Sequence, residues 1–245
     1  MTAAPGAPPG RLAVVVPAYN AERHLGAVLD RLLAVVPAAD VRVVDDGSTD
    51  ATAEVAVGRG VPLVRQSPNQ GKGAALRRGF AETRDYDWIA TLDADGQHDP
   101  SDLPRLLAAA ADGDVVVGCR ELGGRMPALR RFGNRLSSWI IGALAGQPVP
   151  DSQSGYRVHS RRALDSVLPM IGGAGGFVFE TEFLVRAGRQ GYRLAAVRIA
   201  TVYADEESHF RPLEQLPRFL SLFGRLAWEV VTGRAARRPP PGAAA

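Results

Sequence analysis

Hydrophobic and polar positions follow two different patterns along the first half of the chain. Short, mostly apolar runs, typical of buried strands, occur at Leu12–Val16, Val41–Val44, Pro62–Arg65, Trp88–Leu92 and Asp114–Cys119. Segments with helical spacing of apolar residues lie between them, from Leu25 to Leu33 and at 51–58, Lys72–Arg84 and Leu103–Ala111. This alternation predicts an α/β fold in which helices cover a mostly parallel sheet.

The loops that follow the predicted strands are rich in polar residues and glycine. They are Pro17–Asn20, Asp45–Ser48, Gly71–Gly73, Asp93–Gln97 and Arg120. In open α/β sheets the ligand binds outside the carboxyl ends of the strands. We therefore expect these loops to meet at one binding site.

Asp93 and Asp95 come directly after the apolar run Trp88–Leu92. If the strand continues through them, both side chains project to the same face. Two neighbouring carboxylates favour a cation between them, and hard divalent ions in such sites are usually shared with substrate phosphates. The pattern predicts a metal–diphosphate site, although Asp and Gly are also frequent in simple turns.

Two further loops have the composition of a nucleotide site. Asp45 and Asp46 end a strand, where acidic groups accept hydrogen bonds from a nucleobase or ribose. The alternative is capping of the helix at 51–58, for which Asp46, Ser48 or Asp50 are the candidates. Asn69–Gly73, which includes Lys72, resembles a small anion cradle at a helix start, without the full pattern of a kinase-type phosphate loop. A dinucleotide fingerprint after the first strand is also missing.

Composition narrows the class of protein. The 245 residues suit one large domain with a substantial core, and 29 basic against 26 acidic residues give a net charge of only +3, too little to indicate nucleic acid binding. The lone Cys119, in an apolar run, excludes an internal disulfide and indicates packing. No leader peptide or bilayer-spanning run is visible, so we expect a cytoplasmic protein, soluble or peripheral at the inner face of the membrane. The termini, 1–10 and 234–245, are expected to be disordered.

Taken together, the motifs carry a family resemblance. Over roughly residues 11–205 the chain resembles the family 2 inverting glycosyltransferases with the GT-A fold, and within them the polyprenyl-phosphate mannose and glucose synthases. The matching segments are Val15–Glu22, Val44–Asp50, Asn69–Gly73, Asp93–Pro100, Gly118–Arg120 and Asp151–Arg157. On this basis 11–205 is the catalytic domain, and 206–233 is a C-terminal loop and amphipathic helix.

The resemblance implies roles for individual residues. The nucleoside pocket would contain Pro17, Tyr19, Glu22, Asp45 or Asp46, Lys72, Asp93, Ala94 and Asp95. Asp93 would face the ribose or sugar, and Asp95 with Gln97 would bind Mg²⁺ or Mn²⁺ together with the diphosphate. The donor would be GDP-mannose or UDP-glucose.

Asp151–Arg157 combines an acid, hydroxyl and amide groups and an arginine, which a solvated turn does not explain. By analogy with the family, Asp151 and Gln153 would position the donor sugar, while Tyr156 and Arg157 support the loop. Arg120 and Arg131 are candidates for binding an acceptor phosphate, because a guanidinium fits phosphate well.

Two acidic or polar segments have weaker assignments. Glu180 and Glu182 are expected to precede a helix and to complement its dipole, although related enzymes place an acidic residue near the acceptor here. Ser208–Phe210 resembles a loop that closes over the diphosphate. His209 stands where lysine is frequent, and the preceding Asp205–Glu207 is acidic, so its phosphate contact is in doubt.

Two amphipathic helices are expected in the second half. In Arg125–Leu144 an apolar stripe that includes Phe132, Leu136 and Trp139 lies beside a set of polar positions that includes Arg131, Arg135 and Ser138. Such a helix suits a membrane interface, or alternatively packs its stripe on the core and leaves a solvated basic face. Leu213–Val231 is a second such segment.

The expected activity is transfer of one hexose to a polyprenyl phosphate. That acceptor is anionic at neutral pH and needs no strong base, whereas a sugar hydroxyl requires one. Beyond Asp151, Glu180 and Glu182 no base is evident in the second half. The alternatives are a family 2 enzyme acting on a glycolipid or polysaccharide hydroxyl, and a non-catalytic nucleotide-sugar-binding protein.

Overall fold

The sheet has seven strands and is mostly parallel, as predicted. The computed structural model describes residues 8–120, 128–172, 176–200 and 212–232. In spatial order β3-β2-β1-β4-β6-β5-β7, the sheet contains β1 (Leu12–Ala18), β2 (Val41–Asp45), β3 (Leu63–Arg65), β4 (Trp88–Thr91), β5 (Val115–Arg120), β6 (Arg157–Ser160) and β7 (Leu194–Ile199). β6 runs antiparallel to both of its neighbours, and the other pairs are parallel.

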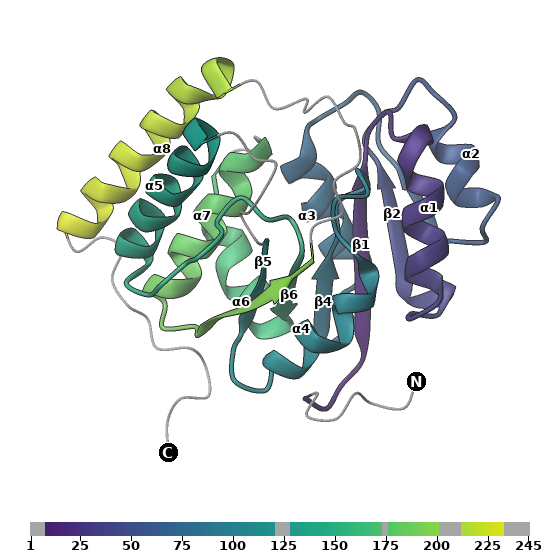
Figure 1. Ribbon diagram of the computed structural model, residues 1–245, viewed down its shortest axis with the longest axis horizontal. Helices are drawn as coiled ribbons and strands as arrows, with labels where there is room; N and C mark the ends of the chain where they lie inside the picture. The colour runs from purple at the N-terminus through teal and green to yellow at the C-terminus, as the bar shows by residue number, and fades with distance from the viewer. Residues whose placement is uncertain (1–7, 121–127, 173–175, 201–211, 233–245) are drawn as a thin grey trace.

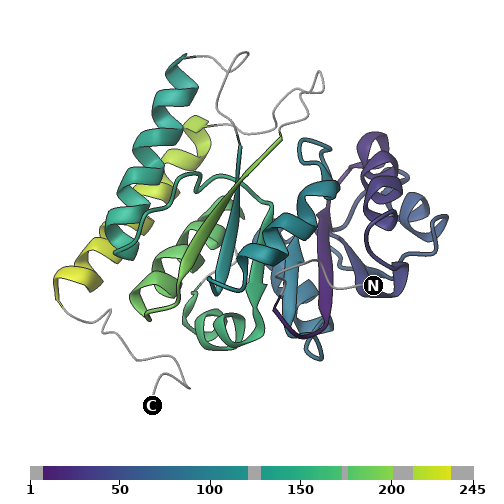
Figure 2. The ribbon, with the colours of Figure 1, turned by 60° about the horizontal axis from the view of Figure 1, so that its bottom comes forward.

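Helices cover both faces of the sheet (Figure 1). The α-helices among the described residues are α1 (Glu22–Leu33), α2 (Thr52–Val57), α3 (Lys72–Glu82), α4 (Leu103–Ala109), α5 (Ala128–Ala145), α6 (Arg161–Val167), α7 (Gly176–Arg189) and α8 (Pro212–Val231). Three short 3₁₀ turns lie at Ala38–Asp40, Pro100–Asp102 and Leu168–Met170. α5 and α8 lie side by side and pack against α7 at one end of the molecule (Figures 1 and 2).

The alternation of β1 divides the core into two layers. Ala13 and Val15 face the layer that contains the apolar side chains of α3, α6 and α7. Val14 and Val16 face the layer of α1 and α4. All four side chains are fully buried, which is why this interior strand is an unbroken apolar run in the sequence.

Several boundaries differ from the sequence prediction. β4 ends at Thr91, so Asp93 and Asp95 lie in the turn that follows it and strand alternation does not set their directions. β6 and β7 were not predicted. α7 begins at Gly176, so Glu180 and Glu182 lie inside the helix and not before it.

The capping prediction for Asp46 and Ser48 is wrong. The residue that precedes α2 is Ala51, whose side chain makes no capping bond, and the carboxylate of Asp50 accepts a hydrogen bond from the Thr52 N–H at 3.0 Å. Asp46 and Ser48 instead hold loops at the edge of the sheet.

The ends and one predicted loop fall partly outside the structure. Residues 1–7, 233–245 and the Ser208–Phe210 segment lie outside the described residues. Within the part that is described, the Pro9 carbonyl accepts a hydrogen bond from the Trp88 indole at 3.3 Å. No described helix combines the length and the apolar character that crossing a bilayer requires.

Candidate active site

The loops after β1 and β2 are joined by short polar side chains. The Asn20 N–H donates to Ser48 Oγ at 2.9 Å, and the Thr49 N–H donates to Asn20 Oδ1 at the same distance. The Ala51 N–H donates to Glu22 Oε2 at 2.9 Å. Asn20 has φ +47°, a left-handed conformation that asparagine tolerates. Glu22, predicted for the nucleoside pocket, therefore also orders the neighbouring loop.

The carboxylate of Asp46 fixes the start of α3. It is 3% exposed and accepts hydrogen bonds from the Gln70 N–H at 2.9 Å and the Gly71 N–H at 2.7 Å. Gly71 has φ +89°, which favours glycine. The Gly71 N–H, expected to cradle an anion of the ligand, is thus bound within the protein.

Asp45 lies beside Asp46 and is fully buried. Its Oδ1 accepts from the Ser48 N–H at 2.9 Å and its Oδ2 accepts from Arg65 Nε at 3.0 Å. Nearby, Pro17 is buried in β1, while the side chain of Tyr19 is 52% exposed at the edge of the sheet. The exposed Tyr19 ring is the residue of this group best placed to stack on a ligand.

Lys72 connects the β4 loop to α7. Its ammonium lies 2.6 Å from Asp93 Oδ1 and 3.0 Å from Glu180 Oε2. Burial disfavours the charge of Lys72, but the two carboxylates outweigh this and raise its pKa. For Asp93, burial raises the pKa, but the positive charges nearby, Lys72 first among them, outweigh this effect and lower the pKa overall. Both groups are charged at neutral pH.

Asp93 also contacts the second half of the chain. A Cβ added at Gly155 would lie 2.3 Å from Asp93 Oδ2, closer than any real contact. Glycine at this position allows the carboxylate to pack directly on the loop that precedes β6. The contact was not predicted from the sequence.

The predicted metal ligands are adjacent in the turn after β4. Asp95 Oδ1 accepts a hydrogen bond from the Gln97 N–H at 3.0 Å, and the side chains of Asp95, Ala94 and Gln97 are buried or half-buried. No group of three or more His, Cys, Asp or Glu side chains among the described residues is arranged to hold a metal. One carboxylate and one amide oxygen suit a hard divalent ion whose remaining ligands come from phosphate and water. The donor set therefore fits Mg²⁺ or Mn²⁺ shared with a substrate.

His98 closes the inner side of this turn. It is 3% exposed, its Nδ1 has no hydrogen-bond partner, and its ring lies 5.6 Å from that of Tyr156. Burial lowers its pKa to about 4, although Asp93 partly opposes the shift. His98 is neutral at physiological pH.

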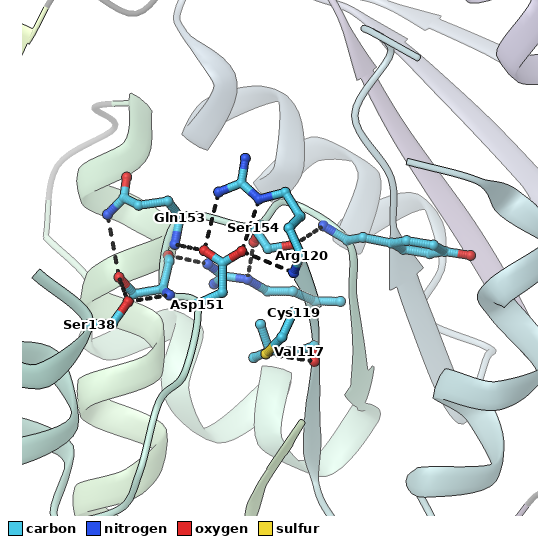
Figure 3. Close-up of polar contacts among 10 residues, drawn as sticks. Val117, Cys119, Arg120, Ser138, Asp151, Gln153 and Ser154 are labelled. Carbon is cyan, nitrogen blue, oxygen red and sulfur yellow. Dashed lines mark hydrogen bonds and ion pairs between the residues drawn. The ribbon is translucent and has the colours of Figure 1, made fainter. Parts of the chain in front are cut away.

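Arg120, at the end of β5, forms a two-point ion pair with Asp151 (Figure 3). Arg120 Nε lies 2.9 Å from Asp151 Oδ2, and Nη2 lies 3.2 Å from Oδ1. Burial disfavours the guanidinium charge, but Asp151 outweighs it and raises the Arg120 pKa, with smaller contributions from Asp93 and Asp95. These charges place Arg120 and Asp151 at the same sheet edge as the β4 turn.

Cys119 is buried beside this pair, as expected for a packing residue. Its Sγ donates to the Val117 carbonyl at 3.6 Å (Figure 3). Burial raises its pKa to about 11, so the thiol stays protonated and is not an activated nucleophile.

The loop that carries Asp151 and Gln153 is held from two sides. The Ser152 N–H donates to Ser138 Oγ on α5 at 3.0 Å, and Gln153 Nε2 donates to Ser137 Oγ at 3.4 Å. Arg157, 1% exposed, donates to the carbonyls of Ser152, Ser154 and Glu180 at 2.8–2.9 Å. The predicted supporting role of Arg157 is confirmed, whereas the contribution of α5 through Ser138 had no signal in the sequence.

Tyr156 supports the same loop from the other face of the sheet. Its hydroxyl donates to the Pro100 carbonyl at 3.2 Å. Arg131, the second candidate for the acceptor phosphate, is half-buried on α5. The structure thus brings Asp93, Asp95, Arg120 and Asp151 to one sheet edge, and the roles assigned to them remain predictions.

A mostly parallel sheet with an Asp-x-Asp turn at the end of its central strand, facing a second loop that carries an acid and an amide, defines a class. The class is the GT-A glycosyltransferases. The glycosyl transferase family 2 profile matches residues 13–168, and the chain belongs to this family.

Known relatives agree with this assignment. The chain is 33% identical over 203 residues to the undecaprenyl-phosphate mannosyltransferase of Micrococcus luteus. This similarity covers 78% of this chain and 84% of that protein. The chain is 29% identical over 209 residues to the polyprenol monophosphomannose synthase of Mycolicibacterium smegmatis, with 78% and 77% covered. Among solved structures, glucosyl-3-phosphoglycerate synthase of Mycobacterium tuberculosis bound to UDP has a TM-score of 0.68 and 26% identity over 89% of this chain and 80% of that one.

Proposed function

We propose that this chain transfers one hexose, with inversion, from a nucleoside-diphosphate sugar to a polyprenyl phosphate. Two relatives named for sugar transfer to polyprenyl phosphates support the acceptor class. The structurally similar glucosyl-3-phosphoglycerate synthase, crystallised with UDP and Mn²⁺, supports a nucleoside-diphosphate sugar and a divalent ion. GDP-mannose and UDP-glucose are the donors to test.

One observation favours a phosphate acceptor over a hydroxyl. Each acidic residue considered as a base in the second half is bound to a cation. Asp151 is paired with Arg120, Glu180 with Lys72, and Glu182 with Arg186 at 2.7 Å. A carboxylate held in this way is poorly suited to remove a proton from a hydroxyl group. A lipid phosphate, with a second pKa near ~6, is already a nucleophile at neutral pH.

The proposed roles follow from the donor atoms. Asp95 and Gln97 would hold Mg²⁺ or Mn²⁺, which supplies neutralisation of the charge on the departing diphosphate. Lys72 keeps Asp93 ionised and oriented toward Gly155. Nε and Nη2 of Arg120 hold Asp151, and Nη1 carries two further N–H donors that suit an acceptor phosphate.

The remaining assignments extend this proposal. Pro17, Tyr19, Glu22 and the Asp45–Asp46 pair would line the nucleoside pocket, and Gln153 would contact the donor sugar. Because the proposed acceptor is a membrane lipid, the chain would work at a membrane surface. Arg131 would then bind either the acceptor phosphate or neighbouring lipid headgroups.

A transfer assay tests the proposal. The full chain is incubated with Mn²⁺, radiolabelled GDP-mannose or UDP-glucose, and a short-chain polyprenyl phosphate. We expect label in an organic-extractable product that mild acid releases, and loss of this product with a chelator. The matched control is the same polyprenol without its phosphate. Equal transfer to that alcohol, or release of free hexose alone, would overturn the phosphate-acceptor proposal.

A further inference from the structure

The outward face of α5 is apolar and unusually exposed. Phe132, Leu136 and Trp139 are 63%, 45% and 71% exposed. Their spacing of four and three residues places them along one side of the helix. The inward side of α5 carries other residues, since Ile141 and Ala145 are the ones that join the core. Phe132, Leu136 and Trp139 of the predicted stripe therefore face away from the protein, whereas Leu144, toward the end of the helix, packs against the core as the alternative expected.

The charge of α5 identifies the kind of partner. The helix contains Arg130, Arg131 and Arg135 and has no acidic residue. α8, beside it, contains two arginines and two glutamates. An exposed aromatic and aliphatic stripe on a helix whose charged residues are all arginines fits an anionic lipid surface. A second copy fits less well, because a symmetric contact would place two helices of charge +3 against each other.

The inward face of α5 holds the loop of the candidate active site. Ser138, 5% exposed, accepts the Ser152 N–H at 3.0 Å and contacts the Ser152 hydroxyl at 3.1 Å. Ser137 accepts from Gln153, and Asp151 accepts the Gln153 N–H at 3.2 Å. Trp139 and Ser138 are neighbours in sequence, and because successive helix residues point about 100° apart, Trp139 is 71% exposed while Ser138 is buried. A displacement or rotation of α5 must therefore be transmitted to the loop that positions Asp151.

We propose that α5 is a two-sided element that docks on an anionic bilayer and thereby sets the position of the Asp151–Gln153 loop. Docking depends only on the exposed stripe and the arginines. The coupling to catalysis rests on the proposed function. Lipid contact would both bring the chain to its acceptor and order the loop, so that transfer is faster at the membrane surface than in solution.

The docking half is tested without substrate. The full chain is mixed with vesicles of phosphatidylcholine alone or with phosphatidylglycerol, and bound protein is measured by sedimentation. We expect binding to the anionic vesicles that weakens as salt rises. Trp139→Ser should weaken it about 10- to 100-fold, since burial of a large apolar side chain contributes that much to partitioning. Trp228→Ser, which removes a Trp of 63% exposure on α8, is the matched control and should bind normally.

Three outcomes would overturn the docking half. They are equal binding of Trp139→Ser and wild type, equal binding to both vesicle types, and a dimer in solution that Trp139→Ser dissociates while no vesicle binds. Circular dichroism and thermal melting of each variant show that the fold is intact, as expected for exposed positions.

The coupling half uses transfer to a water-soluble, short-chain prenyl phosphate. We expect anionic vesicles to raise kcat severalfold for wild type and Trp228→Ser but not for Trp139→Ser. The basal rate without vesicles should be the same in all three. A wild type that binds vesicles without any change in kcat would overturn the coupling. Absence of transfer under all conditions, with docking intact, would instead count against the proposed function.

Discussion

The two halves of the sheet edge are stabilised by different means. In the N-terminal half, formed by β1–β4 and α1–α3, short side chains bind backbone amides of nearby loops, as Asn20 and Asp46 do. In the C-terminal half, formed by β5–β7 and α5–α8, largely buried arginines take a larger part: Arg120 binds the Asp151 carboxylate and Arg157 binds three backbone carbonyls. Both halves fix loop shape through backbone hydrogen bonds, and in the second the Arg120–Asp151 pair also places a largely buried cation and anion at the sheet edge, beside the β4 turn.

The largest expected effect separates chemistry from stability in the N-terminal half. Asp95→Ala should lower transfer about 10³-fold, because several kcal/mol of charge stabilisation depend on the ion it would hold. Thermal melting should change little, since its half-buried carboxylate lies in the loop after β4 and accepts a hydrogen bond from the nearby Gln97 N–H of the same loop. Asp85→Ala, an exposed acidic residue between α3 and β4, is the control and should retain full activity. Undiminished turnover by Asp95→Ala would disprove the metal assignment.

The second prediction tests the charged contacts of the C-terminal half. Glu182 is fully buried in α7 and accepts from Arg186 at 2.7 Å and from Arg225 of α8 at 2.9 Å. Glu182→Leu should lower the free energy of unfolding by about 3 kcal/mol, because it removes the nearer carboxylate of the buried Arg186 guanidinium and leaves it Glu229 at 3.3 Å.

Urea denaturation provides the measurement for this prediction. The control is Asp30→Ala, which removes the exposed Asp30–Arg59 pair of the N-terminal half and should cost less than about 1 kcal/mol. Similar losses from both variants would show that burial does not distinguish the two networks.

The third prediction concerns acid stability of the C-terminal half. His159 of β6 lies edge-on to Phe80 and Phe183, and burial lowers its pKa to about 3. Below the unfolded pKa of about 6.5 the unfolded chain binds a proton that the folded chain does not, so stability falls as pH falls until about pH 3.

The expected slope is about 1.4 kcal/mol per pH unit for this histidine. In His159→Leu, the free energy of unfolding, measured in urea between pH 6 and 4, should therefore fall less steeply as the pH falls, by up to that amount per pH unit. His98 contributes with the same sign in both proteins and cancels in the difference. Parallel pH profiles for the two proteins would contradict the assignment of a neutral, buried His159.

The smallest expected effect on stability comes from the contact between the two halves, where Gly155 lies against the Asp93 carboxylate. Gly155→Ala would place a Cβ against the Asp93 carboxylate and should cost about 1–2 kcal/mol of stability. Transfer activity should fall as well, because Asp93 must move away from Lys72. Gly133→Ala on α5, where nothing lies within 4 Å, is the control and should leave stability unchanged or slightly higher. Equal activity of the two variants would show that the position of Asp93 is unimportant.

The same contrast explains what the sequence could predict. The N-terminal half was readable because each strand is an apolar run followed by a polar loop, and the local order of residues already contains the pattern. β6 was missed because Arg157 and His159 are polar although both are buried, and their partners lie elsewhere in the chain. The Lys72–Glu180 and Ser138–Ser152 contacts join residues that no local pattern relates. α5 was predicted as amphipathic, but only the fold shows that its aromatic stripe faces outward.

The bond from the Gly71 N–H to Asp46 has a consequence for the ligand-free protein. The Asp46 carboxylate already accepts the hydrogen bond of this N–H at the start of α3. No incoming phosphate is needed to satisfy that backbone group. Departure of the spent nucleotide would therefore leave this helix start intact, and the pocket would be ready for the next donor without refolding.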